Sequence, residues 1–356
     1  MPNYGWPEPV ASPEEWRQLL SAAEAFKTAR PWIWMFETML FAVQNPETDE
    51  VGFCSITGQG GEHFALIVYL GEEALGNYFS AVHGTHAVSF LEEREHGMLL
   101  LEAPQLQASF ESPQALPAMD RRLVKEAKVR IRGRDLWPAF RSFMPGRAPW
   151  YLTRPQVRFL TVLLEQALIV AEMQLRENML GSQGGDLPKT LQLLSRVYAE
   201  GVWSSVERTF TPRYPVFPTG TASADLAAVR RQLPLQDLQL QVHLALTPMP
   251  VEEGPLPPYL PYLLLVVDAE SGMVAGAELL LAQPTLADLW PQVLPKLLEV
   301  FDRLQGRPKR IQLVSERLYH LLAAPLGELG VKLTRARTMP ALEEALQGFE
   351  DWLATS

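Results

Sequence analysis

The sequence predicts an α+β protein built from two domains. Its 356 residues exceed the roughly 100–200 residues that one domain usually takes. Apolar residues make up 47% and charged residues 20%, a globular composition. The first half shows a strand meander with helices, and the second half shows strands that alternate with helices. These features exclude a mostly disordered chain, a collagen-like fibre and a disulfide scaffold.

The predicted N-terminal domain starts with a helix. Ser12 can cap it, Pro13 suits its first turn, and Glu15 completes a capping box. Alternating apolar residues then predict an antiparallel sheet with a helix across it. The expected strands are 40–44, 51–56 and 63–70, the expected helix is 72–82, and a weaker strand pair is expected at 98–102 and 106–110.

A linker is expected in the middle of the chain. A helix near 116–128, a basic loop rich in aromatics and prolines, and a long helix over 155–176 precede it. The run Gly-Ser-Gln-Gly-Gly-Asp at 181–186 has the composition of a linker. We therefore expect an N-terminal domain over 1–180, a linker over 181–190 and a C-terminal domain over 191–356.

The C-terminal domain is predicted to be mixed α/β, with an N-terminal extension. The extension holds a hairpin around Gly201 and a short helix over 224–232. Turn residues and apolar periodicity then predict the order β-β-β-α-β-α-β-α. Its elements are expected at 238–246, 262–268, 273–281, 286–304, 310–314, 317–329, 331–336 and 341–353.

This order, with local sequence patterns, resembles the ribonuclease H-like fold of retroviral integrase cores and transposases. The similar segments are Val266–Glu278, Ile311–Glu316 and Gly330–Lys332, and the resemblance covers roughly residues 236–354. It implies clustered carboxylates that hold two Mg²⁺ ions. The strand 238–246, where the first acid belongs, contains none.

The remaining acidic positions of that family are only partly matched. Ser315 stands where the second acid belongs and is followed by Glu316, while Glu343 or Glu344 could supply the third. We therefore expect a catalytically silent domain that holds no metal or cofactor. The alternative is a divergent metal-dependent nuclease or phosphotransferase that uses Asp268, Glu270 and Glu316. Against it, Asp268 precedes Ala-Glu-Ser-Gly and suits a turn residue that bonds its own backbone.

The whole chain also resembles a bacterial two-domain family of unknown function. The similarity is carried by five short segments: 31–35, 43–48, 61–66, 145–150 and 267–272. This resemblance implies no activity, cofactor or site residue.

The segment from Arg121 to Arg158 is the most strongly charged part of the sequence. It holds eleven Lys and Arg residues against Glu126 and Asp135, although the chain as a whole carries a formal charge of −10. Arginines interleaved with aromatics suit a phosphate-tracking surface, but they equally suit pairing with the protein's own acids. The candidate binding residues are Arg130, Arg132, Arg134, Arg141, Arg147, Trp137 and Trp150.

Other groups carry weaker signals. His83, His86 and His96 with nearby glutamates could accept zinc, although Gly84 interrupts their spacing. Glu62 and His63 are adjacent on a strand, where their side chains point to opposite faces.

The sequence favours a non-enzymatic, cytoplasmic binding protein. Cys54 is the single cysteine, which suits a reducing compartment, and neither a signal peptide nor a spanning segment is expected. The expected partner is a protein, with nucleic acid an alternative through residues 121–158 and no membrane contact. Whether that segment faces solvent or the protein's own acids decides between these interpretations.

Overall fold

The computed structural model describes residues 9–83, 89–133, 136–183, 187–216, 226–251 and 257–355. These residues form two compact units. The described residues of the first unit are 9–83, 100–133, 136–144, 149–183 and 187–214, and those of the second are 89–99, 145–148, 215–216, 226–251 and 257–355.

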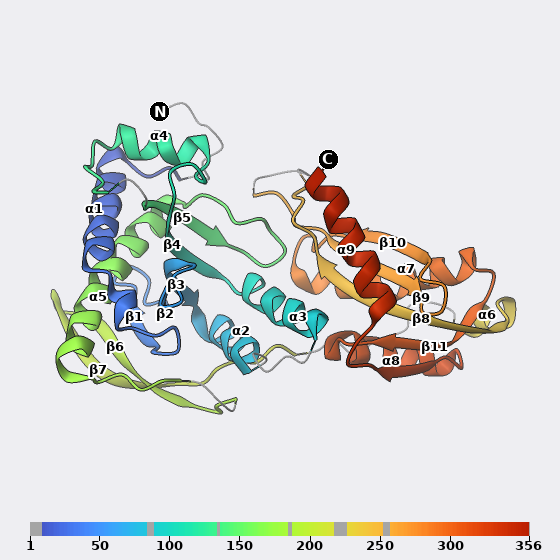
Figure 1. The fold of residues 1–356 in the computed structure, drawn as a ribbon. Helices are drawn as coiled ribbons and strands as arrows, with labels where there is room; N and C mark the ends of the chain where they lie inside the picture. Colours follow the sequence, from blue (N-terminus) through green and yellow to red (C-terminus); the bar gives the residue numbers. More distant parts are fainter. Residues whose placement is uncertain are drawn as a thin grey trace. The chain divides into compact units, whose positions relative to one another are not determined.

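The first unit contains a seven-stranded sheet in the order β5-β4-β3-β2-β1-β6-β7 (Figure 1). Neighbouring strands pair antiparallel, except that β1 and β6 are parallel. The strands are β1 (Phe41–Gln44), β2 (Val51–Thr57), β3 (Phe64–Leu70), β4 (Gln105–Glu111), β5 (Trp137–Phe143), β6 (Leu191–Ala199) and β7 (Val202–Phe210).

Helices cover both faces of this sheet. Side chains along β1 point alternately to the two faces of the sheet. Phe41 and Val43 therefore lie in one core, whereas Ala42 and the preceding Leu40 lie in the other. The first core is closed by α1 (Pro13–Ala29), α4 (Ala118–Glu126) and α5 (Arg154–Glu177), and the second by α2 (Gly71–His83). The short helix η1 (Pro31–Ile33) follows α1.

The predicted start of the first helix is confirmed. The Ser12 Oγ accepts a hydrogen bond from the Glu15 N–H, and a Glu15 carboxylate oxygen accepts one from the Ser12 N–H. Both bonds satisfy backbone groups that a helix start otherwise leaves unpaired.

The second unit contains a five-stranded sheet in the order β10-β9-β8-β11-β12. The strands β8, β9 and β10 pair antiparallel, whereas β11 lies parallel to both β8 and β12. The strands are β8 (Leu235–Leu246), β9 (Tyr262–Asp268), β10 (Val274–Leu280), β11 (Arg307–Leu313) and β12 (Lys332–Arg335).

Two core regions lie on the faces of this second sheet. Leu240, Val242 and Leu244 of β8 pack into the core that also holds residues of two helices. These helices are α7 (Trp290–Arg303), preceded by η3 (Leu286–Asp288), and α8 (Glu316–Glu328). The other face is covered by α9 (Pro340–Thr355), while α6 (Leu226–Gln232) contributes Leu226 to the α7–α8 core.

The helix α3 (Phe90–Leu101) joins the second unit over residues 90–99, although its sequence lies among first-unit elements. Its Leu91 is fully buried against the α9 core. Arg94 forms an ion pair with Glu350 of α9 at 2.5 Å. The apolar side chain and the ion pair together explain why this helix packs with residues far along the chain.

Most of the expected elements are present, including the N-terminal meander, the hairpin at Gly201 and the order of the last eight elements. The strand expected at 98–102 is wrong, because residues up to Leu101 continue α3. A short apolar run does not by itself distinguish a strand from a helix end. The strand β5 lies inside the expected basic loop. Pro138 is tolerated there because β5 is an edge strand.

The division between the units differs from the expected one. The sequence placed 191–210 in the second domain, whereas β6 pairs with β1 and β7 pairs with β6 in the first sheet. Pairing between distant strands, which no local composition records, makes this difference.

Candidate functional site

The basic segment holds cations that contact groups of the protein itself and cations that form no ion pair among the described residues. The Arg121 guanidinium donates to backbone carbonyl oxygens of Pro113 and Leu116, and Arg122 pairs with Glu126 at 2.5 Å. The cations with described partners are Arg121, Arg122, Arg141, Arg147, Arg154 and Arg158.

Arg141 forms the most buried of these ion pairs. Its two terminal nitrogens each donate to one Asp120 carboxylate oxygen at 2.8 Å, and only 3% of the Asp120 side chain is exposed. The guanidinium also lies 4.9 Å from the centre of the Tyr151 ring. Burial alone would lower the pKa of Arg141, but the hydrogen bonds and charge of Asp120 raise it above its ordinary value. Arg141 therefore does not offer a free charge to a ligand.

Arg147 is engaged within the second unit. Its guanidinium lies 3.4 Å from the centre of the Tyr259 ring and donates to the Tyr259 hydroxyl and to the carbonyl oxygen of Pro257. This is a stacked arginine with hydrogen-bonded ends, a geometry that lysine would not reproduce. It holds residues 145–148 against the second unit.

Arg154 and Arg158 of α5 converge on Glu15 of α1, at 2.9 and 2.6 Å. Burial opposes ionisation of this carboxyl, but the Ser12 backbone N–H and the two arginines lower the pKa of Glu15 to about 2. Arg158 also reaches Glu47 at 3.2 Å. This network ties the two helices together.

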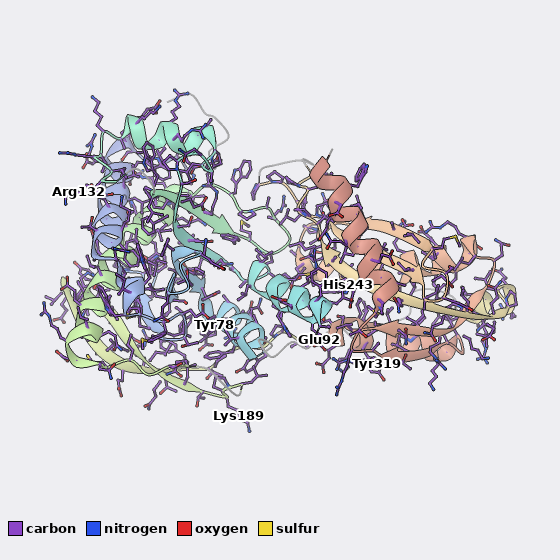
Figure 2. All side chains as sticks on the ribbon, viewed as in Figure 1. Tyr78, Glu92, Arg132, Lys189, His243 and Tyr319 are labelled. Atoms are coloured by element: carbon purple, nitrogen blue, oxygen red, sulfur yellow. The ribbon has the colours of Figure 1, made fainter. Side chains whose placement is uncertain are left out.

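Four exposed cations of the segment have no ion-pair partner among the described residues. Within the described residues, no ion pair involves the side chains of Lys125, Lys128, Arg130 and Arg132. We call these four residues the basic surface. Figure 2 shows Arg132 beside α1, at the margin of the first unit. Arg134, the remaining candidate of this run, lies outside the described residues.

Two side chains of α1 hydrogen-bond to the backbone of the loop that carries Arg132. The Lys27 ammonium of α1 donates to the carbonyl oxygens of Arg132 and Leu136, at 2.7 and 3.2 Å. The Glu24 carboxylate accepts from the Arg132 N–H at 2.9 Å. Since Lys27 and Glu24 also pair with each other at 2.7 Å, this loop is anchored while its arginine side chains point away. Neither anchor was expected from the sequence, because α1 lies about a hundred residues earlier.

The aromatic residues of the segment mostly pack within the protein. Phe140 is 3% exposed, and Trp137 packs against the first core. Trp150 is half-buried, forms a backbone bridge with Ser142 and lies edge-on to Tyr151 at 5.4 Å. The aromatic candidates therefore act mainly as anchors of β5 and the following loop.

The three carboxylates of the metal hypothesis have separate surroundings. Asp268 Oδ1 accepts from the N–H groups of Glu270 and Ser271 and from the Ser271 hydroxyl, at 3.1, 2.7 and 2.7 Å. Burial opposes its ionisation, but these hydrogen bonds hold the pKa of Asp268 below its usual value. Glu316 lies near His320 and Arg335. Among the described residues, no group of three His, Cys, Asp or Glu side chains is placed to hold a metal ion.

His243 of β8 is a buried polar residue that sequence reasoning did not single out. It is 1% exposed, and its Nδ1 has no hydrogen-bond partner among the described residues. Figure 2 shows it within the second unit, on the strand where the integrase-like pattern would place an acid. Burial, reinforced by the positive charges of Arg94 and Arg317, lowers its pKa to about 4.

The remaining sequence candidates are only partly described. His86 lies outside the described residues, as does the side chain of His83. The strand expected to hold Glu62 and His63 begins only at Phe64, so both residues precede β3. His63 Nε2 lies 2.6 Å from the Gln107 side-chain nitrogen of β4. Cys54 is fully buried, and burial raises the pKa of its thiol far above the ordinary value, which makes it inert as a nucleophile.

Comparison with known proteins places the two halves of the chain separately. Residues 16–186 match a domain of unknown function (DUF7309), and residues 225–350 match another domain of unknown function (DUF6930). The two matches give the chain a two-domain layout. The expectation of an uncharacterised two-domain family is thereby confirmed. Neither the curated proteins nor the solved structures contain a match.

The first matched range fits the units only in part, whereas the second lies within the second unit. The first range ends before β6 and β7, which complete the sheet of the first unit, and it includes α3, which packs in the second. In the described part of the chain, no helix combines the length and the apolar character needed to span a bilayer.

Proposed function

We propose that this chain is a non-enzymatic binding protein whose basic surface contacts an acidic surface of a protein partner. The observation that carries this proposal is the split within the basic segment. Six cations contact groups of the protein itself, although Arg122, Arg154 and Arg158 among them are still exposed. The four cations of the basic surface are exposed on an anchored loop and helix end and form no ion pair among the described residues. Grouped exposed charges steer association with oppositely charged partners.

A protein partner is favoured over nucleic acid by the aromatic residues. Proteins that bind single strands offer rings on which bases stack, in addition to positive charge. Here Phe140 is buried and Trp137 packs against the core. Among the described residues of the segment the aromatic rings are buried or half-buried, whereas the four cations of the basic surface are exposed. Exposed charge of this kind suits carboxylates better than bases.

For the second unit we propose a ribonuclease H-like fold that performs no metal-dependent phosphodiester chemistry. The strand order β10-β9-β8-β11-β12, with parallel pairing only at β11, supports the fold. The absence of chemistry is supported by Asp268, whose Oδ1 is occupied by the turn, and by His243 in place of an acid on β8. No specific observation favours the alternative of a divergent nuclease or phosphotransferase.

We also propose that the protein acts in the cytoplasm of a bacterium. The cytoplasmic assignment is supported by its single, buried cysteine, which needs no oxidising compartment. The bacterial assignment rests on the resemblance described above.

The basic surface is tested by binding a fluorescent glutamate-rich peptide at low and at physiological salt. The double variant Arg130→Glu/Arg132→Glu should bind at least about tenfold more weakly than the wild type, because four units of charge change at the contact. Measured anisotropy should also show weaker wild-type binding at the higher salt concentration, as expected for exposed charges.

A matched control changes the same net charge elsewhere in the first unit. Arg176 and Lys189 are both exposed (Lys189 is labelled in Figure 2), and Arg176→Glu/Lys189→Glu should bind within about twofold of the wild type. Equal losses in both double variants would mean that only overall charge matters. Tighter binding of an oligothymidine of equal charge would favour the nucleic-acid interpretation instead, and no binding of the peptide by the wild type would refute the proposal.

A further inference from the structure

The strand β7 forms an edge of the seven-stranded sheet. Among the described strands, none pairs with its outer side. Val202 is 66% exposed and Val206 is 40% exposed, and residues 204–209 are all exposed. Proteins usually protect such an edge with charged side chains, especially lysine, with proline or with a bulge. The strand β7 contains no proline or lysine, its only charged residues are Glu207 and Arg208, and its register with β6 runs without a break over nine residues.

The hairpin turn determines which backbone groups of β7 face outward. Glu200 and Gly201 both have positive φ, 51° and 83°, as a two-residue type I′ turn requires. In such a hairpin the closing pair, Ala199 and Val202, is a hydrogen-bonded pair, and hydrogen-bonded pairs recur at every second residue. The N–H and C=O groups of Trp203, Ser205, Glu207 and Thr209 therefore point to the free edge.

We propose that this edge pairs antiparallel with the β7 edge of a second copy of this chain, in a register centred on Val206. A two-fold axis normal to the sheet places the same face of the sheet on the same side in both copies. Residues that lie opposite each other must therefore both be even-numbered or both be odd-numbered. Centring on Val206 overlaps the whole strand and brings the outward-facing residues into hydrogen-bonding pairs, Ser205 with Glu207 and Trp203 with Thr209.

The pattern of charges selects this register over its neighbours. With Val206 on the axis, Glu207 faces the serine at 205 and Arg208 faces the serine at 204, while Val202 meets Phe210. The two Glu207 side chains then lie on a diagonal. Centring on Glu207 or on Arg208 would place identical charges directly opposite each other, which destabilises a strand pair. Centring on Ser205 shortens the overlap. In this register the β7 strands of two copies therefore pair along their whole length without directly opposed like charges.

Cysteine cross-linking tests the register directly. Two Val206 residues on the axis would form a non-hydrogen-bonded pair with Cα atoms about 4.5 Å apart, within the reach of a disulfide. Val206→Cys should therefore give a covalent dimer under mild oxidation, read on a non-reducing gel. The native Cys54 is fully buried and does not interfere.

Arg208→Cys is the matched control on the same face of β7. Its copies would lie four residues apart along the paired strands, about 13 Å, which is beyond disulfide reach. This variant should remain uncrosslinked, whereas the double variant Ser204→Cys/Arg208→Cys should cross-link. Equal cross-linking of the two single variants, or none with Val206→Cys, would overturn the register.

The oligomeric state provides an independent measurement. Sedimentation of the wild-type chain at tens of micromolar should show a dimer, and Val206→Lys should shift it to monomer, because two ammonium groups then meet on the axis. Circular dichroism should show the same fold in both, since Val206 is exposed in the single chain. A monomeric wild type would overturn the proposal.

Discussion

At the scale of single residues, spatial neighbours decide what each charge of the basic segment does. Arg141 and Arg132 are close in sequence and identical in type. Arg141 meets the buried carboxylate of Asp120, whereas the side chain of Arg132 points to solvent above the anchor of Lys27 and Glu24. The sequence left exposure to solvent and pairing with the protein's own acids as alternatives for the whole segment. In the structure, some of its cations are paired and others are not.

His243 provides a prediction about acid stability. The pKa of His243 is about 6.5 in an unfolded chain and about 4 in the folded protein. Between these two pH values the imidazole is protonated in the unfolded state but neutral in the folded state. Its contribution to stability is intact above pH 6.5 and is lost as the pH falls toward 4, by about 1.4 kcal/mol per pH unit. His243→Leu should remove this slope and also remove an unpaired buried nitrogen.

The measurement is the urea unfolding free energy of both proteins at pH 7, 6 and 5. We expect the advantage of His243→Leu over the wild type to grow as the pH falls. His320, which is exposed on α8, supplies a control at neutral pH: His320→Gln should change the unfolding free energy at pH 7 by less than about 0.5 kcal/mol, as surface substitutions usually do. Parallel curves for His243→Leu and the wild type would contradict the assigned cause.

At the scale of helices and strands, periodicity and caps predicted most elements. The meander β1–β3, the long helix α5 and the alternation after β8 all follow from local patterns. The two errors share a cause. The strand β5 and the end of α3 carry short apolar runs whose conformation depends on partners distant in sequence. The strand β5 pairs with β4, and in α3 Met98 packs into a core of the second unit while Leu100 packs against a core of the first.

Replacing either of two helical glycines with alanine should change the free energy of unfolding in opposite directions. A Cβ on Gly76 of α2 would overlap the backbone of Arg213, which follows β7 and donates its N–H to Glu72. Gly76→Ala should therefore destabilise the first unit by about 2 kcal/mol or more, as overpacking does.

Gly97 of α3 is the matched control, since a Cβ there meets nothing within 4 Å among the described residues. Gly97→Ala should be neutral or stabilising by about 0.5–1 kcal/mol, because alanine favours a helix. Thermal melts of both variants make the comparison. A neutral Gly76→Ala would show that α2 and the segment after β7 do not approach as closely as described.

At the scale of the whole molecule, each unit is assembled from separated parts of the chain. Strands β6 and β7 extend the sheet of the first unit through a parallel pair with β1, while α3 and residues 145–148 belong to the second. A composition shift in the sequence marks a linker but does not record which strands pair across it.

Leu91 makes this assembly testable. Although it lies between elements of the first unit in sequence, it is fully buried in the second. Leu91→Ala should lower the protection of β9 amides against hydrogen exchange by about 3 kcal/mol and leave β2 and β3 amides unchanged.

Leu75 of α2, which is buried in the first unit, should show the reverse pattern on Leu75→Ala. Loss of protection in β2 after Leu91→Ala would mean that α3 stabilises the first unit instead.

By itself, the sequence determined the α+β class, the two-part organisation, most of the elements and the unusual charge of residues 121–158. Those properties follow from composition, period and capping, which are local. Only the tertiary structure decided which of the basic residues are exposed, that Asp268 Oδ1 accepts the hydrogen bonds of its own turn, and that β7 is left at a sheet edge. These outcomes depend on which distant groups come within a few ångströms, since hydrogen bonds and ion pairs act only at that range.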